Sequence, residues 1–315
     1  MLDITAIILT YNEELHIHRC LENVNQFAKR VYVIDCFSKD KTVEIAESMG
    51  ATVVQHQWPG NQAEQFNWAL ENINIDTEWI LRLDADEYCS ENLIAEMREH
   101  LPKLSTEYYA VVLPLGRVFM GRELKHGIAN GIKMIRLFRN GKAKYEKRIM
   151  DEHLSVAEGG KTVTFKHPFY DASMISIAQF VDKHNKYAAR EAALLLDAEF
   201  NLTAHNNEEN SYCEEVVAKR KQKEKYAKMK IFWRSFFYFC YRYIAKLGFL
   251  DGKEGFVWDF MQGWWYRTLV DTIVFETKKA CGNDKEKIRE HLLKKDITKP
   301  MPATKFSNAK TAEGK

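Results

Sequence analysis

Short apolar runs alternate with amphipathic segments along the first part of the chain. The apolar runs have the length and β-branched content of buried strands, and they cover residues 4–9, 31–34, 52–54 and 79–83. The segments between them space their apolar side chains as helices do, over residues 13–27, 41–49 and 61–72. Strands that alternate with helices predict parallel βαβ units, so we expect an α/β fold whose sheet is covered on both faces.

The pattern changes beyond Ser90. Two further strands are expected at 108–115 and 133–138, joined by a glycine-bearing loop at 121–131, so the second half of the sheet should be mixed. From Ser173 onward the spacing is helical, with candidate helices at 173–196, 213–247, 254–280 and 284–295. We expect a sheet domain over residues 1–170, a helical region over 171–299 for acceptor, membrane or dimer contacts, and a flexible tail over 300–315.

Composition narrows the class of protein without naming a function. With 46 basic and 44 acidic side chains the net charge is +2, so no global field favours nucleic acid. The six cysteines show no C-x-x-C pair, which fits reduced thiols in a cytoplasmic protein. The start of the chain does not resemble a signal peptide, and the aromatic stretch 231–243 contains two arginines and is too short to span a bilayer. The oligomeric state cannot be read from the sequence.

Polar residues follow three of the expected strands. They are Thr10-Tyr11-Asn12-Glu13, then Asp35 with Ser38 and Asp40, and Asp84-Ala85-Asp86-Glu87. In open α/β sheets ligands bind beyond the carboxyl ends of the strands, so these residues should lie near one another. Two carboxylates one residue apart can give one oxygen to a divalent cation and another to a hydroxyl group. Asp-x-Asp is common in turns and caps, so its weight here comes from its position after a strand.

Four segments resemble motifs of the inverting family 2 glycosyltransferases, which have the GT-A fold. The resemblance extends over about residues 3–170. The proline that often precedes the Tyr-Asn pair in that family is Thr10 here. The segments, in chain order, are Ile7–Glu13, Val33–Thr42, Leu83–Glu87 and Met150–Leu154. The resemblance implies a Rossmann-like, mostly parallel mixed sheet flanked by helices, with a helical C-terminal extension.

For the donor, the resemblance implies a nucleotide-diphospho sugar, with UDP expected, and a divalent metal, Mn²⁺ or Mg²⁺. Asp35 is expected to accept a hydrogen bond from the uracil ring, Asp84 to lie near the ribose and Asp86 to bind the metal. The segment from Trp58 to Asn67 looks like one that lines the nucleotide in a bacterial subgroup making surface polysaccharide and lipopolysaccharide core. The residues expected to contact the donor are Thr10, Tyr11, Asn12, Glu13, Asp35, Ser38, Gln62, Gln65 and Asp84.

The fourth motif concerns the acceptor. An inverting transfer needs a general base within hydrogen-bond reach of the acceptor hydroxyl. The resemblance implies a carboxylate here, with Asp151 the first choice and Glu152 a close rival. His153 could complete the metal shell or bind a phosphate, although a histidine beside acids is more often a structural hydrogen-bonding partner.

Two arginines of the expected strand at 133–138 and its end have two readings. Arg136 and Arg139 could steady the diphosphate or the acceptor. Solvated arginines at a strand edge would produce the same pattern in the sequence. We keep both readings open.

The C-terminal part carries a stripe of basic residues beside many aromatic ones. Lys230, Arg234, Arg242 and Lys246 fall on a four-residue progression. Such a helix could lie on the inner face of the cytoplasmic membrane and bring the enzyme to a lipid-linked acceptor. Alternatively, the aromatic residues pack on the transferase domain or on a second subunit. Residues 183–188 and 250–256 also look like segments of the polysaccharide subgroup.

Two other functions are weighed against this one. A sugar-nucleotide nucleotidyltransferase would ordinarily show a glycine-rich phosphate loop with a basic residue after the first strand, and Tyr11-Asn12-Glu13 offers neither. A non-catalytic relative would not need Asp84, Asp86 and Asp151 together. We therefore expect metal-assisted transfer of a sugar, with inversion, to a hydroxyl of a lipopolysaccharide-core or lipid-linked glycan.

Overall fold

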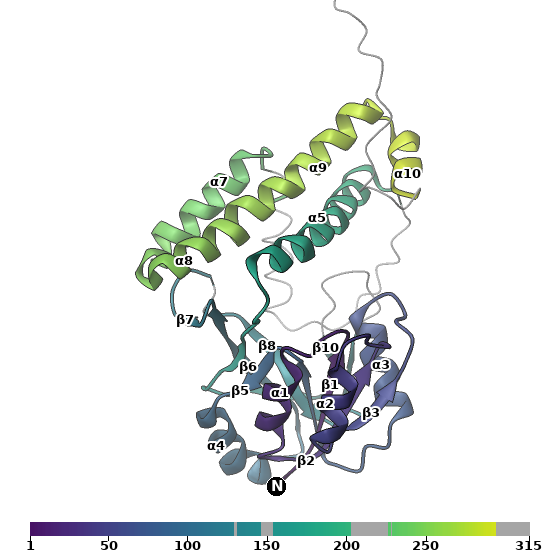
Figure 1. The fold of residues 1–315 in the computed structure, drawn as a ribbon, viewed down its shortest axis with the longest axis vertical. Coiled ribbons are helices and arrows are strands. Elements are labelled where there is room, and N and C mark those ends of the chain that lie inside the picture. The colour runs from purple at the N-terminus through teal and green to yellow at the C-terminus, as the bar shows by residue number, and fades with distance from the viewer. Residues whose placement is uncertain (129–130, 146–153, 203–225, 228, 294–315) are drawn as a thin grey trace, which may run out of the picture. The chain divides into compact units, whose positions relative to one another are not determined.

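The computed structural model describes residues 1–128, 131–145, 154–202, 226–227 and 229–293 (Figure 1). These residues form two compact units. The first contains residues 1–175 together with Tyr241–Asp259, and the second contains the described parts of 176–240 and 260–293. Tyr241–Asp259 lies within the stretch that the sequence analysis assigns to the helical region. The expected boundary at residue 170 stays a prediction, and the expected tail over 300–315 lies outside the described residues.

The first unit is built on a mixed sheet. Its parallel half has the order β3-β2-β1-β4, and each of these strands lies where the sequence predicts one. Their bounds are β1 (Leu2–Thr10), β2 (Ala28–Asp35), β3 (Thr52–Gln55) and β4 (Trp79–Asp84). Because β1, β2 and β4 are parallel and in register, Thr10 lies beside Asp35, and Leu9 beside Asp84.

The other half of the sheet is mixed, as predicted. It continues from β4 through β8 (Lys133–Arg139), β6 (Tyr108–Phe119), β12 (Phe169–Asp171) and β5 (Glu87–Cys89). β8 runs antiparallel to both β4 and β6. Two further strands pair with β6, namely β7 (Arg122–Leu124) and β11 (Lys161–Thr164). A separate pair is formed by β9 (Ala143–Tyr145) and β10 (Leu154–Val156).

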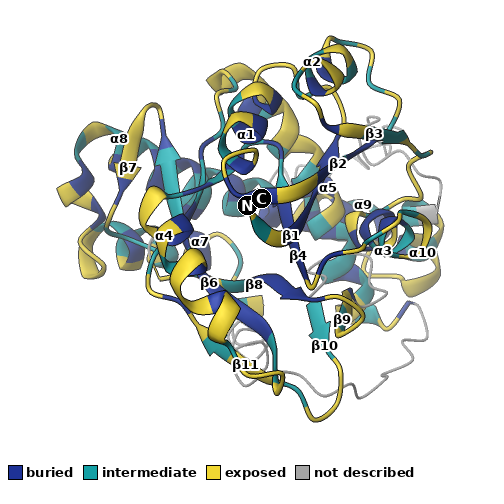
Figure 2. Cartoon of the chain, turned by 90° about the horizontal axis from the view of Figure 1, so that it is seen from below, coloured by how far each residue is buried: buried dark blue, intermediate teal, exposed yellow. Residues whose placement is uncertain are grey.

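Helices pack on the sheet through the alternating side chains of its strands. Ile4, Ala6 and Ile8 of β1 belong to one apolar cluster, whereas Ile7 and Leu9 belong to another. The first cluster takes in residues of α1 (Ile17–Val24), α2 (Thr42–Ser48) and α4 (Glu91–His100), which the short turn η1 (Leu101–Lys103) follows. The second takes in residues of α3 (Gln62–Asn72). Figure 2 shows β1 and β4 as mostly buried and the outer sides of α1, α2 and α4 as exposed.

The last part of the first unit consists of short helical turns. These are the π-turn η2 (Tyr241–Ala245), the 3₁₀ turn η3 (Gly248–Asp251) and α8 (Gly252–Asp259). Arg242 does not belong to an exposed basic stripe, contrary to the sequence-based interpretation. It is buried, and its Nε donates to Asp259 Oδ1 at 2.8 Å.

The second unit is helical. It contains α5 (Ile177–Phe200), α7 (Trp233–Cys240), the π-turn η4 (Phe260–Trp265), α9 (Tyr266–Cys281) and α10 (Lys285–Leu293). A capping box of Ser176 and Gln179 begins α5, which packs on α9. Arg234 of α7 is also buried, in an ion pair with Asp271. Among the described residues, no helix is both long and apolar enough to cross a membrane.

Candidate active site

The loops that follow β1 and β2 are joined by hydrogen bonds. Asn12 has a left-handed backbone (φ 57°), a conformation in which asparagine is enriched. Its N–H donates to Ser38 Oγ at 2.8 Å, and its side-chain Oδ1 accepts from the Lys39 N–H at 2.8 Å. The Glu13 N–H donates to Thr42 Oγ1, also at 2.8 Å. The two loops therefore form one connected edge, from which the Tyr11 ring is exposed.

The Glu13 carboxylate contacts His16, which directly precedes α1. Its Oε2 lies 2.6 Å from His16 Nδ1, and His16 Nε2 accepts the Met174 N–H at 2.9 Å. Because Nε2 is an acceptor, the ring proton belongs on Nδ1, where it is donated to Glu13. The Glu13 carboxylate thus fixes the start of α1 through His16.

Asp35 is fully buried at the end of β2. Its Oδ1 accepts the hydroxyls of Thr10, at 3.0 Å, and Ser38, while its Oδ2 accepts the Ser38 N–H at 2.9 Å and Gln55 Nε2 at 3.3 Å. A carboxylate has about four lone-pair sites, so these donors occupy its capacity. A hydrogen bond from a uracil ring to Asp35 would require one of these donors to leave.

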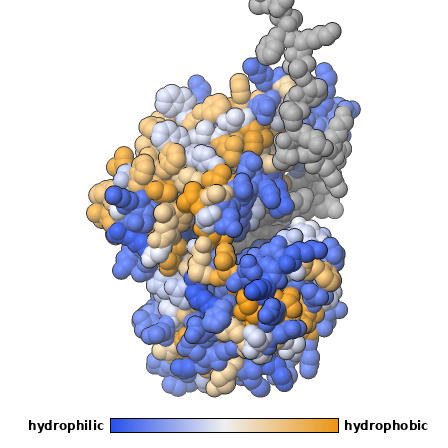
Figure 3. All heavy atoms as spheres, in the orientation of Figure 1, coloured by the Kyte–Doolittle hydropathy of each residue, from blue (hydrophilic) through white to orange (hydrophobic). Residues whose placement is uncertain are grey.

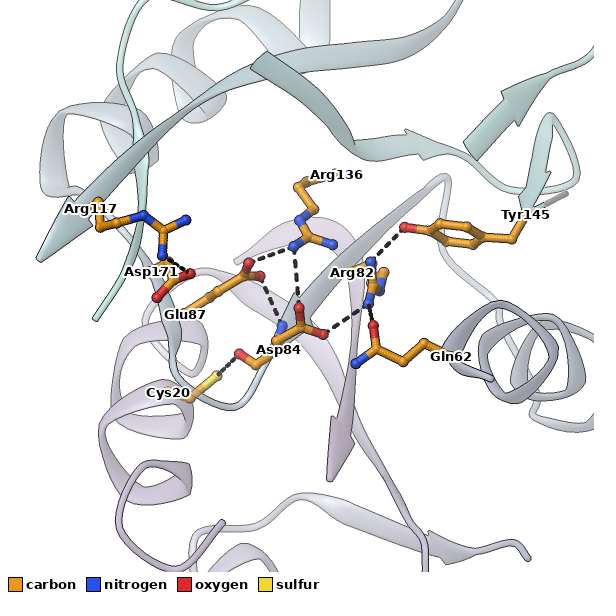
Figure 4. Close-up of polar contacts among 9 residues, drawn as sticks. All are labelled: Cys20, Gln62, Arg82, Asp84, Glu87, Arg117, Arg136, Tyr145 and Asp171. Carbon is orange, nitrogen blue, oxygen red and sulfur yellow. Dashed lines mark hydrogen bonds and ion pairs between the residues drawn. The ribbon is translucent and has the colours of Figure 1, made fainter. Parts of the chain in front are cut away.

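Asp84, at the end of β4, lies in a cluster of two acids and two arginines (Figure 4). Arg82 Nη2 donates to Asp84 Oδ1 at 2.9 Å, and Arg136 Nη2 lies 3.3 Å from Asp84 Oδ2. Arg136 Nη2 also donates to Glu87 Oε1 at 2.5 Å, and the Asp84 N–H donates to Glu87 Oε2 at 2.9 Å. Both arginines and Glu87 are buried, whereas the Asp84 side chain is 29% exposed. Asp84 is thus the member of the cluster that faces solvent.

Burial has the largest effect on the pKa of Glu87. It raises the pKa of this carboxyl from 4.5 to about 8, and Asp84 adds to the rise, while Arg136, the Asp84 N–H and Arg82 oppose it. At neutral pH the carboxyl therefore keeps its proton. The cluster then contains two guanidinium groups and one carboxylate, that of Asp84.

Asp86 is held through its backbone. Its carbonyl oxygen accepts Arg19 Nη2 at 3.0 Å and the Ala172 N–H at 3.0 Å, and the same arginine nitrogen reaches the Ala172 carbonyl at 2.6 Å. The side chain is half-buried. No group of three or more histidine, cysteine or acidic side chains that could hold a metal ion occurs in the part of the chain that the structure describes.

The two glutamines of α3 lie beside these strand ends. Gln62 Oε1 accepts Arg82 Nη2 at 3.1 Å, so the first residue of α3 is tied to the Asp84 cluster. Gln65 is fully buried, 2.7 Å from His56 Nδ1 and 3.3 Å from Cys36 Sγ. Gln65 therefore braces the segment after Asp35 from within.

Arg139 does not join the cluster. β8 runs antiparallel to β4, and Arg139 pairs with Trp79 at the opposite end of that strand from Asp84. It forms an ion pair with Glu78, stacks over the Trp79 ring at 4.5 Å and donates to three backbone carbonyls, those of Leu104, Ser105 and Tyr108. The structure therefore gives Arg139 a packing role and does not bring it to the strand ends where the other residues meet.

The sequence assigns no particular role in the site to three residues, although Glu87 belongs to the polar stretch after the fourth expected strand. Arg82, Glu87 and Tyr145 join the cluster, with Arg82 Nη1 donating to the Tyr145 hydroxyl at 2.8 Å. A usable signal existed for Arg82, because a single charge inside an otherwise apolar strand needs a buried partner. The predicted base residues Asp151 and Glu152 and the predicted metal ligand His153 lie outside the described residues.

The sequence comparisons agree with this geometry. The model of the family named "Glycosyl transferase family 2" matches residues 5–169. The chain belongs to this family. It is a glycosyltransferase, and its mixed sheet flanked by helices has the GT-A fold.

Relatives of this glycosyltransferase occur in Rickettsia. An uncharacterized glycosyltransferase of Rickettsia typhi is 26% identical over 265 residues, which are 82% of each chain. One from Rickettsia bellii is 31% identical over 61% of this chain and 67% of its own. Among solved structures, a mannosyltransferase from Pyrobaculum calidifontis in complex with GDP-Man and Mn²⁺ covers 87% of both chains, with 14% identity and a TM-score of 0.48.

Proposed function

We propose that this glycosyltransferase moves a sugar from a UDP-sugar donor to a hydroxyl of a lipopolysaccharide-core or lipid-linked glycan, with inversion and with the help of Mn²⁺ or Mg²⁺. The observation that carries the proposal is that Asp84 and Asp86 are held by different contacts. Asp84 is bound by two arginines at the end of β4. Asp86 follows on the same edge and is fixed through its backbone.

The metal is assigned to Asp86. A carboxylate that already faces two guanidinium groups is a poor ligand for a cation, because those positive charges repel the metal. Mg²⁺ and Mn²⁺ use few protein carboxylates and complete their shells with phosphate oxygens and water, so a single aspartate suits them. When bound, such a metal would offset the negative charge of the departing diphosphate. His153 is proposed as a further ligand on the strength of the motif alone.

The donor nucleotide is assigned to the connected edge of β1, β2 and β4. Tyr11 offers an exposed ring to the base, and the partly exposed Asp84 carboxylate can accept a ribose hydroxyl. Asp35 acts mainly by shaping the loop that carries Ser38, since its own oxygens are occupied. Arg136 supports the donor site indirectly, by holding Asp84.

The base and the acceptor rest on the motif resemblance. Asp151 is proposed to take the proton of the attacking hydroxyl, with Glu152 as the alternative. A single displacement then inverts the anomeric centre. The resemblance of residues 183–188 and 250–256 to the polysaccharide subgroup supports a glycan acceptor.

The metal assignment is tested by thermal unfolding with UDP, with and without Mn²⁺. We expect UDP to raise the melting temperature of the wild type only when Mn²⁺ is present, and Asp86→Ala to abolish that rise. Asp76→Ala is the matched control, because Asp76 lies on the surface before β4 and pairs with Arg30. Equal stabilisation of wild type and Asp86→Ala by UDP would refute the assignment of the metal to Asp86.

Catalysis is tested with the same protein. Asp151→Asn should keep the Mn²⁺-dependent stabilisation by UDP and lose hydrolysis of the sugar nucleotide. Unchanged turnover in this variant would assign the base to Glu152. A wild type that binds UDP with Mn²⁺ but turns over no member of a nucleotide-sugar panel would instead identify a non-catalytic relative.

A further inference from the structure

The short turns at the end of the first unit expose an unusual number of large apolar side chains. Six of them are between 45 and 60% exposed within sixteen residues. We call this set the apolar ridge. Its members are Tyr241, Ile244, Leu247, Phe249, Leu250 and Phe256. Figure 3 shows apolar residues, in orange, on the left of the view, where Figure 1 places α8. A surface with so many neighbouring apolar side chains usually contacts something other than water.

The turns beneath the ridge are rigid. Arg242 and Asp259 form a buried ion pair on their inner side. A Cβ on Gly248 would lie 2.0 Å from Asp259 Oδ2, and a Cβ on Gly255 would lie 2.5 Å from the Gly248 carbonyl oxygen. These close approaches hold η3 against α8. The ridge side chains are thus presented by a packed support, and two of them, Phe249 and Phe256, also contact the ring of Tyr243.

One ridge residue sits where the backbone disfavours it. Leu247 has a left-handed conformation with φ 61°, which costs a residue with a side chain roughly 1 kcal/mol relative to glycine. A glycine would serve the turn at lower cost. The exposed leucine side chain therefore contributes something other than stability of the turn.

The charges around the ridge are positive. Lys246 and Lys253 are exposed, and Lys246 lies over the Tyr241 ring at 5.6 Å. The acids of the same segment are paired: Asp251 is buried against His126, and Glu254, whose side chain is 32% exposed, lies 3.4 Å from Arg122. The ridge thus combines projecting apolar and aromatic side chains with cations and without an exposed, unpaired carboxylate.

We propose that the apolar ridge inserts into the headgroup region of an anionic lipid bilayer. Tyrosine, phenylalanine and leucine flanked by lysine are the side chains that bind at such an interface. Each lysine close to an anionic surface strengthens binding about fivefold. A bilayer accepts projecting side chains without a matching groove, whereas a protein partner would have to supply one. The inference depends on the proposed function only for what the membrane would carry, namely a lipid-linked acceptor.

Vesicle sedimentation with the full chain tests the proposal. The probes are vesicles of phosphatidylcholine alone and of phosphatidylcholine with about one third phosphatidylglycerol. We expect binding to the anionic vesicles to be at least about tenfold stronger and to weaken with salt, because two exposed lysines act together. Ile244→Asp with Phe249→Asp should reduce that binding by about tenfold or more, since each removes an inserted apolar group.

The control for the double variant is Phe275→Asp. Phe275 lies on α9 and is 47% exposed, close to the 46% of Phe249, so its replacement should leave vesicle binding unchanged. Phe249→Leu should retain binding, which separates lost insertion from misfolding. No binding of the wild type to anionic vesicles would overturn the proposal. So would a dimer in sedimentation velocity that the double variant dissociates, because the ridge would then bind a second copy. Mn²⁺-dependent stabilisation by UDP, measured without vesicles, reports on the donor site separately.

Discussion

Replacing Glu87 with glutamine tests whether burial or pairing with Arg136 determines the protonation state of Glu87, at the centre of the donor site. Glutamine has nearly the same shape but cannot ionise. Its one amide oxygen can accept either the Asp84 N–H or Arg136 Nη2, and its NH₂ group then faces the other donor. Burial raises the pKa of Glu87 from 4.5 to about 8. A carboxyl whose pKa is raised on folding binds more protons in the folded state, so the free energy of unfolding falls as pH rises between these two values.

The size of the effect follows from that interval. Each pH unit between about 4.5 and 8 should cost the wild type about 1.4 kcal/mol, and the total loss approaches about 5 kcal/mol as an upper bound. Glu87→Gln lacks this titration. We therefore expect the stability of the variant relative to the wild type to rise progressively from about pH 4.5 to about pH 8 and to stay constant above it, on top of a pH-independent cost for the donor that glutamine leaves unpaired.

Denaturant unfolding at several pH values between 5 and 9 measures this difference. Glu78→Gln is the matched control: Glu78 also pairs with a buried arginine of β8, Arg139, but its side chain is 49% exposed. It should show no such pH-dependent gain. The opposite result would refute the reasoning. If Arg136 keeps Glu87 ionised, Glu87→Gln leaves a buried guanidinium poorly paired and should destabilise the protein by about 3–5 kcal/mol at every pH.

Two further predictions concern the support of the two sites. Arg82→Met should weaken Mn²⁺-dependent UDP binding about tenfold in calorimetry, because Asp84 loses one charge-assisted hydrogen bond; unchanged affinity would mean that Arg136 alone orients Asp84. Gly248→Ala should destabilise the chain by about 1–3 kcal/mol in thermal unfolding, because its Cβ meets the fixed Asp259 carboxylate. Gly160→Ala, where the added Cβ meets the half-buried ring of Tyr109, should cost less, and equal losses would argue against a rigid turn.

The sequence predicts the location of the strand ends well. The four parallel strands and the mixed second half of the sheet are confirmed. Parallel strands in register bring their carboxyl ends to one edge, so the residues after β1, β2 and β4 had to meet there once those strands were recognised. Hydrogen bonds such as the one from the Asn12 N–H to Ser38 Oγ then join residues that are 26 positions apart in the sequence.

The contacts that those residues make within the protein could not be predicted in the same way. The hydrogen bond expected from a uracil ring to Asp35 stays a prediction, and the sequence does not show that Thr10, Ser38 and Gln55 already donate to its oxygens. Arg136 and Arg139 belong to one expected strand and its end, so the sequence gives them the same possible roles. Whether such a residue reaches the site depends on the register with β4, which an alternating pattern does not reveal.

The spacing of the C-terminal arginines identifies one face of a helix, but it does not show whether that face points to solvent or to the interior. A four-residue spacing of cations beside aromatic residues defines two faces of a helix, and the usual rule turns the charged one outward. Arg242 and Arg234 point inward instead, because Asp259 and Asp271 supply buried carboxylates, 17 and 37 residues further along the chain. A paired arginine can be buried, and the aromatic side chains of the same stretch are then partly exposed, as Phe237 and Tyr241 are, and partly packed, as Phe236 and Phe239 are on Trp264. The direction of the face is therefore set by acids distant in sequence, and in the first unit the Arg242–Asp259 pair lies on the inner side of the ridge that we propose binds the membrane.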